Sequence, residues 1–234
     1  MKILLLADSH LLTEWNEKAA NDLVEFLKNS GLHYNKIFLL GDIFDFYYEY
    51  KYCIPKHFFP VYKVLKELID NGVKIEYWAG NHDFWQGEFL RKLGIITHSR
   101  PETVSIDNKQ LFIGHGDYLG EANLLQFILR NEFARAFFSL IHPDIGFGIA
   151  KFISRLSRNS SGKSLPKMNN YIEFAKKEFK KGIDLILLGH IHHQFIFRQG
   201  EKKLVIVGDW KYHKYYAELK DGKIFLRCAT QSPK

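Results

Sequence analysis

Cysteine is scarce in this chain, and no long apolar run occurs. The only two cysteines, Cys53 and Cys228, form no CxxC pair, so the sequence indicates neither a disulfide framework nor a thiolate metal site. No segment approaches the roughly 20 apolar residues of a membrane span. The short apolar run at the start ends at Asp8 and is more typical of a first strand than of a signal peptide. We therefore expect a cytoplasmic protein.

Acidic residues are also in deficit. The 234 residues include 33 lysines and arginines against 26 acidic residues, a formal net charge of +7. This excess favours an anionic partner, which could be a phosphorylated substrate, an anionic lipid surface or nucleic acid. A lysine-rich solvated surface would give the same composition. The length fits one domain, or one domain with a sizeable insertion.

Apolar runs alternate with helical periodicity over the first part of the chain. Strands are expected at residues 2–7, 37–40 and 73–79, with helices at about 16–29, 59–70 and 88–93 between and after them. This rhythm predicts a largely parallel sheet covered by helices. A hairpin at 103–106 and 110–113 begins a second sheet, and residues 183–227 show almost only strand patterns. The fold class is therefore α/β with two sheets.

Polar residues with metal-binding side chains follow five of these apolar runs. They are Asp8 and His10, Asp42, Asn81 and His82, His115, and His190 and His192. Function collects at strand ends in open α/β sheets, so we expect these side chains to converge. Mixed oxygen and imidazole ligands suit manganese, iron or zinc rather than calcium. Asp42 is the candidate for a carboxylate shared by two metal ions.

The five blocks in this order resemble the signature of the calcineurin-like metallophosphoesterases. The blocks begin at Asp8, Gly41, Gly80, Gly114 and Gly189. The resemblance implies a four-layer αββα sandwich of two mixed sheets. It also implies two divalent ions, most simply Mn, with Fe and Zn as alternatives. One ion would be held by Asp8, His10, Asp42 and His192, and the other by Asp42, Asn81, His115 and His190.

The same resemblance gives roles to four neighbours of the metals. His82 would bind a phosphoryl oxygen or protonate the leaving oxygen, and Asn81 would touch phosphate as well as metal. Asp45 and Asp83 would orient imidazoles. Helix capping is the alternative for these two aspartates. Asp209 is not assigned to metal, and five histidines are interpreted as ordinary surface or core residues: His33, His57, His98, His142 and His213.

Residues 118–182 form an apolar, basic segment that belongs to neither sheet pattern. It contains six phenylalanines between 127 and 152, and helices are expected at about 121–140 and 145–157. We interpret it as a helical cap inserted into a core of residues 1–117 and 183–234. Its apolar residues either leave a face for a ligand or a membrane, or simply pack the cap onto the core.

Within the family, the chain is most similar to the pyrophosphatases that cleave UDP-2,3-diacylglucosamine in lipid A biosynthesis. The similarity includes Gly208-Asp209-Trp210 and a basic loop in the cap. It implies a nucleotide-linked glycolipid as substrate. The apolar and basic face of the cap would contact the inner membrane peripherally, and its apolar content is unlike a groove that tracks phosphates, so no nucleic acid partner is expected. The loop residues that would bind the substrate are Arg158, Asn159, Ser160, Lys163 and Lys167.

One residue departs from that group, which commonly has arginine at the position of His82. A metallophosphoesterase acting on soluble nucleotides or phosphodiesters therefore remains an alternative. A non-catalytic scaffold is a third interpretation, although binding alone would not require the complete ligand set.

Overall fold

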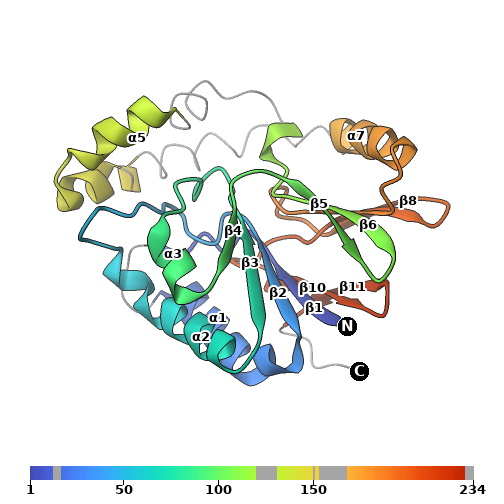
Figure 1. Cartoon of the computed structure of the whole chain (residues 1–234), viewed down its shortest axis with the longest axis horizontal. Coiled ribbons are helices and arrows are strands. Elements are labelled where there is room, and N and C mark those ends of the chain that lie inside the picture. Colours follow the sequence, from blue (N-terminus) through green and yellow to red (C-terminus); the bar gives the residue numbers. More distant parts are fainter. Residues whose placement is uncertain (13–16, 120–130, 150, 153–167, 230–234) are drawn as a thin grey trace.

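Two β-sheets form the centre of the computed structural model, which describes residues 1–12, 17–119, 131–149, 151–152 and 168–229 (Figure 1). The first sheet has six strands, in the order β11 (Lys223–Cys228), β10 (Tyr215–Lys220), β1 (Lys2–Leu6), β2 (Lys36–Leu40), β3 (Lys74–Trp78) and β4 (Ile96–His98). Strands β1 to β4 are parallel, whereas β10 and β11 are antiparallel to their neighbours.

The second sheet is also mixed. Its order is β5 (Glu102–Ile106), β6 (Lys109–Ile113), β7 (Leu185–Leu188), β9 (Lys202–Ile206) and β8 (Phe195–Gln199). Its three central strands are parallel, and each edge strand pairs antiparallel with its neighbour. The carboxyl ends of β6 and β7 therefore lie together, as those of β1, β2 and β3 do.

Helices cover the outer face of each sheet. Alternate residues of β1 and β2 pack against α1 (Lys18–Ser30) and α2 (Phe59–Asp70), while the residues between them face the second sheet. On the second sheet, Ile186 and Leu188 pack against α7 (Met168–Lys180). The layers are helix, sheet, sheet and helix, so the expected αββα sandwich of two mixed sheets is confirmed.

Most expected elements occur within one or two residues of their expected bounds. The expected helices at 59–70 and 88–93 are α2 and α3 (Glu88–Leu93). The short edge strand β4 was not expected from the sequence. Strands β10 and β11 return to the first sheet and extend it beyond β1, so the last part of the chain contributes to both sheets.

The described part of the inserted segment is helical at α5 (Glu132–Ser139) and at residues 143–149 (Figure 1). Phe138 and Phe147 pack against Phe46, Tyr50 and Trp85, which lie in the loops that follow β2 and β3. The division into a core and a cap at residues 118–182 stays a prediction. Helix α7 lies within that range and packs on the second sheet.

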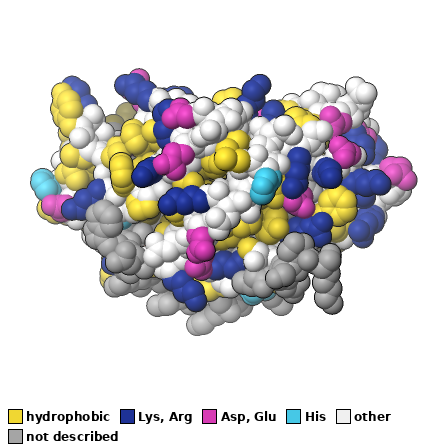
Figure 2. Space-filling model, turned by 90° about the horizontal axis from the view of Figure 1, so that it is seen from below, with side chains coloured by type: hydrophobic (Ala, Val, Ile, Leu, Met, Phe, Trp, Pro, Cys, Tyr) yellow, Lys and Arg dark blue, Asp and Glu magenta, His cyan; other side chains and the backbone are white. Residues whose placement is uncertain are grey.

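The excess of basic residues does not form one basic patch on the face shown in Figure 2. On the face shown in Figure 2, basic and acidic side chains are interspersed with apolar ones. Such mixing is typical of a solvated surface. Among the described helices, none is long and apolar enough to cross a membrane.

Candidate metal centre

The candidate ligands lie two to four residues beyond the ends of β1, β2, β3, β6 and β7. Five of them have a left-handed backbone, with φ of 51° at Asp8, 41° at His10, 51° at Asp42, 70° at His190 and 58° at His192. Side chains with a Cβ rarely adopt this conformation, and such residues cluster at functional sites. The chain therefore turns sharply after β1, β2 and β7 and brings these five side chains together.

Two glycines make the close approach possible. A Cβ on Gly41 would lie 2.5 Å from Nδ1 of His115, and one on Gly80 would lie 2.1 Å from Oδ1 of Asp42. Gly41 also has a positive φ of 85°. These distances explain why glycine precedes Asp42 and Asn81 in the sequence.

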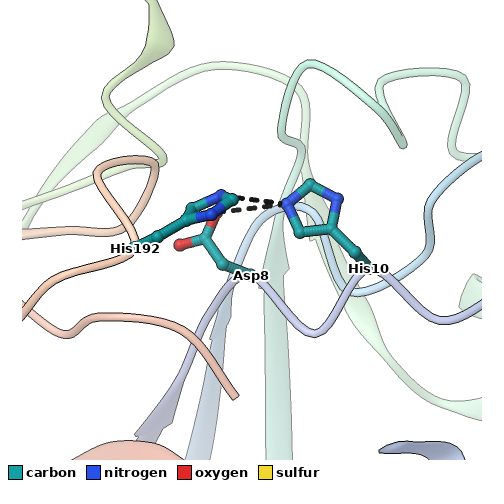
Figure 3. Close-up of side chains that lie close together, drawn as sticks. All are labelled: Asp8, His10 and His192. Carbon is teal, nitrogen blue, oxygen red and sulfur yellow. Dashed lines mark hydrogen bonds and ion pairs between the residues drawn. The ribbon is translucent and has the colours of Figure 1, made fainter. Parts of the chain in front are cut away.

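Asp8, His10 and His192 form the first cluster (Figure 3). Nε2 of His10 lies 3.1 Å from Nε2 of His192, which lies 3.3 Å from Oδ1 of Asp8. Asp8 is fully buried, and this Oδ1 has no hydrogen-bond partner among the described residues. Its other oxygen accepts a hydrogen bond from the backbone N–H of His190 at 2.8 Å.

Asp42, His115 and His190 form the second cluster, and Asn81 extends it. Nε2 of His115 lies 3.2 Å from each of three atoms: Oδ2 of Asp42, Nδ1 of His190 and Oδ1 of Asn81. Nδ1 of His115 donates to the carbonyl oxygen of Leu40 at 2.7 Å. This bond engages Nδ1, so Nε2 is the ring nitrogen that faces the cluster and can bind a cation.

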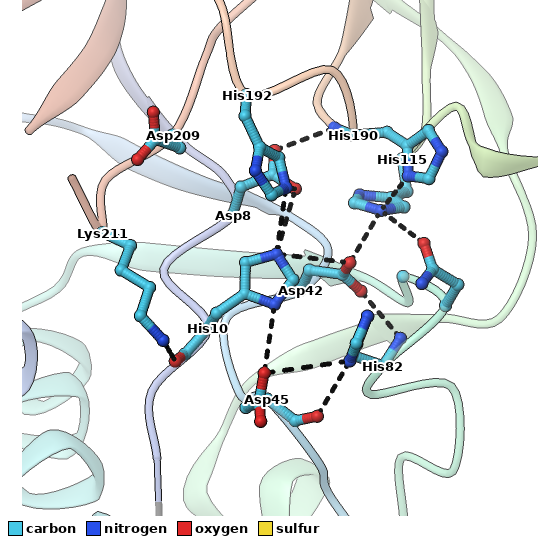
Figure 4. A network of polar contacts seen from close by, with 12 residues as sticks. Asp8, His10, Asp42, Asp45, His82, His115, His190, His192, Asp209 and Lys211 are labelled. Atoms are coloured by element: carbon cyan, nitrogen blue, oxygen red, sulfur yellow. Dashed lines mark hydrogen bonds and ion pairs between the residues drawn. The ribbon is translucent and has the colours of Figure 1, made fainter. Parts of the chain in front are cut away.

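Asp42 lies between the two clusters (Figure 4). Its Oδ2 is 3.7 Å from Nε2 of His10 and 3.2 Å from Nε2 of His115, and its Oδ1 accepts a hydrogen bond from the backbone N–H of His82. The residue is 1% exposed. One carboxylate thus faces both imidazole sets, as the sequence analysis expects of a shared ligand.

This donor set fits two divalent cations. Donor atoms about 2.1 Å from a common ion at right angles would be roughly 3 Å apart, and the nitrogens of each cluster show that spacing. Two lone pairs facing each other at this distance are unfavourable unless a proton or a cation lies between them. The unpartnered Oδ1 of Asp8 points to the same conclusion. All seven residues expected to bind metal are brought together.

Asp45 and His82 lie beside the first cluster (Figure 4). Oδ1 of Asp45 is 3.6 Å from Nδ1 of His10, and Nδ1 of His82 donates to the backbone carbonyl oxygen of Asp45 at 2.9 Å. The rings of His10 and His82 meet edge to face with centroids 4.8 Å apart. Asp45 therefore orients both imidazoles and leaves Nε2 of His82 available to a substrate.

Asp83 has a different position. Its fully buried carboxylate accepts hydrogen bonds from the backbone N–H of Ile43 at 2.7 Å and of Gly80 at 2.8 Å, and from the hydroxyl of Tyr77. These contacts tie the loop after β2 to the loop after β3. Asp83 thus positions the backbone that carries Asp42 and Asn81, rather than an imidazole.

Burial and mutual charge shift the pKa values at the site. Burial alone would raise the pKa of Asp42, but the charges of His115 and His82 hold it well below its usual value. Burial lowers the pKa of His190 to about 4, assisted by repulsion from His115. Burial and the charge of Asp42 raise the pKa of Asp83 to about 6. An ionised Asp42 and a neutral His190 are the forms that bind metal.

The pKa of His115 shifts in the opposite direction to that of His190. Burial lowers the pKa of its imidazole, but the charge of Asp42 outweighs this effect and raises the pKa well above its usual value. This direction favours a proton on the ring in the metal-free protein. A cation bound at Nε2 would have to displace that proton.

Two further residues lie near the site: Lys211, which no sequence pattern indicated, and Asp209, which the sequence did not assign to metal. Nζ of Lys211 donates to the carbonyl oxygen of His10 at 2.9 Å, across 201 residues of sequence. The carboxylate of Asp209 is fully buried, on the same side of Asp42 and His10 as His192 (Figure 4), and accepts a hydrogen bond from His213. The five cap residues expected to bind substrate, from Arg158 to Lys167, lie outside the described residues.

A family model for calcineurin-like phosphoesterases matches residues 1–194, which include every candidate ligand. The chain belongs to the calcineurin-like phosphoesterase family. It is therefore a metal-dependent phosphoesterase, and its site is built for divalent cations. The resemblance inferred from the five sequence blocks is confirmed.

Relatives of similar length match almost the whole chain. A UDP-2,3-diacylglucosamine hydrolase of Porphyromonas gingivalis is 30% identical over 92% of this chain and 93% of its own length. The Haemophilus influenzae protein of that name is 27% identical over 92% of each chain. Among solved structures, an archaeal phosphodiesterase has a TM-score of 0.51 at 15% identity and covers 97% of this chain and 99% of its own, which shows the shared fold.

Proposed function

We propose that the protein hydrolyses the diphosphate of UDP-2,3-diacylglucosamine and releases UMP and 2,3-diacylglucosamine 1-phosphate. The observation that carries the reaction class is the position of Asp42 between two imidazole clusters. The named relatives, similar over about nine tenths of both chains, support this substrate.

In this proposal Asp8, His10, Asp42 and His192 hold one cation, and Asp42, Asn81, His115 and His190 hold the other. Two such cations would supply positive charge for the phosphoryl oxygens and lower the pKa of a bound water. The mixed oxygen and nitrogen donors favour manganese, with iron and zinc as alternatives. No described cysteine lies in a candidate metal group.

The protein's own groups orient the diphosphate and manage one proton. The oxygen of water adds to one phosphorus, and the bond from that phosphorus to the bridging oxygen breaks. Nε2 of His82 would donate to a phosphoryl oxygen or give its proton to the bridging oxygen as it leaves, because Nδ1 is already engaged with Asp45. The amide nitrogen of Asn81 would bind a further phosphoryl oxygen while its Oδ1 faces the metal.

The acyl chains suit the exposed apolar side chains near α5, a helix that packs on the loops after β2 and β3 through Phe138. Six large apolar side chains of α5 and residues 140–152 are exposed, and we name them the α5 apolar face: Phe133, Phe137, Leu140, Ile145, Ile149 and Phe152. Phe133 is 84% and Leu140 83% exposed, which is unusual for side chains of this size. In this proposal the face belongs to a cap formed by residues 118–182.

The α5 apolar face also supports contact with the cytoplasmic surface of the inner membrane. An exposed apolar helix face binds the headgroup region in proportion to the area that it buries there. The basic net charge of +7 would add attraction to anionic lipids. A substrate that resides in a bilayer would then reach the metal centre without crossing water.

The direct test is incubation of the purified, Mn-loaded protein with UDP-2,3-diacylglucosamine in mixed micelles, with UMP measured by chromatography. We expect UMP and the sugar 1-phosphate in equal amounts. Bis(4-nitrophenyl) phosphate serves as a generic diester control. Turnover of that diester without UMP release would refute the substrate and leave the phosphoesterase class in place, as the soluble-substrate alternative requires.

A further inference from the structure

The segment after β9 runs beside the metal centre. Backbone N–H groups of Trp210 and Lys211 donate to the carbonyl oxygens of Ala7 and Asp8, at 3.1 and 3.4 Å. Together with the bond from Lys211 to His10, these contacts fix residues 209–213 against the strand end that carries the first cluster.

A buried carboxylate determines the shape of this segment. Asp209 is fully buried and accepts hydrogen bonds from the backbone N–H of Tyr212 at 2.6 Å and from Nδ1 of His213 at 2.5 Å. The second bond orients the imidazole and leaves Nε2 as its remaining polar atom. The His213 side chain is 43% exposed, so Asp209 anchors an imidazole that solvent and ligands can reach.

Two aromatic side chains contact the His213 ring that Asp209 orients. His213 stacks on Tyr215 with an interplanar angle of 10°, and its centroid lies 5.7 Å from that of His193. His193 is exposed and directly follows the candidate ligand His192. Tyr212 is 67% exposed. His193 and His213 are thus accessible rings that contact each other, and His193 is next in sequence to a first-cluster ligand. Tyr212 is an accessible ring next in sequence to Lys211, which bonds to His10.

Asp209, which anchors His213, lies across the centre from the loops that contact α5 (Figure 4). Phe46 follows Asp45 directly, Trp85 lies close to His82 in sequence, and both contact Phe138 of α5. In Figure 4, His82 and Asp45 are on one side of Asp42 and His10, whereas Asp209 is on the other side, together with His192. A diphosphate at the centre therefore has apolar surface toward one end and polar rings toward the other.

We infer that Tyr212, His213 and His193 form a subsite for the nucleoside of the substrate. This inference rests on the proposed function, which places a nucleoside and two acyl chains at opposite ends of one diphosphate. The exposed rings would stack on the base, as aromatic side chains do in nucleotide-binding proteins. Nε2 of His213 would form a hydrogen bond with the base or the ribose. Asp209 acts as a positioning residue for that imidazole.

Competition against hydrolysis of bis(4-nitrophenyl) phosphate tests the subsite without the lipid substrate. UMP and inorganic phosphate are compared as inhibitors of the Mn-loaded protein, since only UMP carries the nucleoside. We expect UMP to inhibit the wild type more tightly than phosphate. Tyr212→Ala and His213→Ala should each weaken inhibition by UMP about 5- to 20-fold and leave inhibition by phosphate unchanged.

His33→Ala is the matched control, because His33 is an exposed histidine in the 3₁₀ turn Gly31–His33 before β2, at the opposite end of the strand. It should change neither inhibition constant. Tyr212→Ala removes only an exposed ring, so it keeps the test valid if His213→Ala fails to fold. Three results would each overturn the inference. The variants could bind UMP as tightly as the wild type does, they could lose affinity for UMP and phosphate equally, or the wild type could bind UMP no more tightly than phosphate. Ring-dependent UMP binding without cleavage of the lipid substrate would instead refute the proposed function alone.

Discussion

Nε2 of His10 lies 3.1 Å from Nε2 of His192, although 182 residues separate the two histidines. Each ring is carried by a left-handed residue just beyond a strand end, and the two strands belong to different sheets. The sandwich therefore builds the metal centre by stacking the sheets so that their strand ends meet. The first candidate metal group, Asp8, His10 and His192, is thus contributed by both sheets.

Replacement of Asp42 by Ala should disrupt both metal sites together. Its Oδ2 faces His10 and His115, so no other described carboxylate can take its place between them. We expect metal content after reconstitution to fall below one ion per chain. Activity should fall by more than the roughly 10- to 100-fold loss typical of an outer-sphere change. Elemental analysis with diester kinetics measures both, and full metal content in the variant would contradict the shared ligand.

His82→Ala should separate catalysis from metal binding. The backbone N–H of His82 donates to Asp42, and Nδ1 of its ring donates to the carbonyl oxygen of Asp45. Nε2 of the ring is then the atom that can act on the substrate. We expect kcat to fall roughly 10²- to 10⁴-fold with metal content unchanged. Elemental analysis provides the control. A variant with normal kcat would exclude the proposed role.

Manganese binding should release a proton from His115. Burial lowers the pKa of this imidazole, but the charge of Asp42 outweighs burial and raises the pKa in the metal-free protein, which favours the protonated ring. Apparent affinity should therefore rise with pH, by about tenfold per unit for each proton released. Titration calorimetry in two buffers of different ionisation enthalpy counts the protons. Identical heats in both buffers would show that none is released.

Asp83→Ala should destabilise the fold rather than act on chemistry directly. The change leaves the buried N–H groups of Ile43 and Gly80 and the hydroxyl of Tyr77 without their acceptor. At roughly 1 to 3 kcal/mol for each unsatisfied group, we expect a loss of about 3 kcal/mol or more in the free energy of unfolding. Urea denaturation measures it. Asp70→Ala, at an exposed helix position, is the control and should cost under about 1 kcal/mol.

The α5 apolar face should govern vesicle binding without affecting soluble substrates. The triple variant Phe133→Ser, Phe137→Ser and Leu140→Ser removes exposed side chains, so the fold should persist. Each large apolar side chain contributes roughly 1.5 to 3 kcal/mol when buried, so co-sedimentation with anionic vesicles should fall at least about tenfold. Leu32→Ser, at an exposed leucine remote from α5, is the control. Unchanged sedimentation of the triple variant would exclude this face as the membrane contact.

Periodicity predicted most of the fold because strands and helices are local patterns. Helix α2 begins and ends at the expected residues, and each candidate ligand follows an apolar run that proved to be a strand. The edge strand β4 was not predicted because a strand of three residues is too short to show an alternating pattern. The place of β10 and β11 in the first sheet could not be predicted either, because strand order depends on long-range packing.

Side-chain partners were predictable only where a motif names them. The phenylalanines of the inserted segment looked alike in sequence, yet Phe138 packs on Trp85 while Phe133 and Phe137 are exposed. Packing onto the core thus holds for Phe138, whereas a face for a ligand or a membrane stays a prediction. The hydrogen bond between Asp209 and His213 could be found only in the structure, because a buried carboxylate and an exposed histidine produce no periodic pattern in the sequence.

The central claim is that Asp42 bridges two cations, and anomalous diffraction from Mn-loaded crystals tests it most directly. The structure predicts two manganese peaks roughly 3.5 to 4 Å apart, on either side of the Asp42 carboxylate. One peak should be bounded by His10 and His192, and the other by His115 and His190. A single peak, or two peaks that do not share Asp42, would contradict the account.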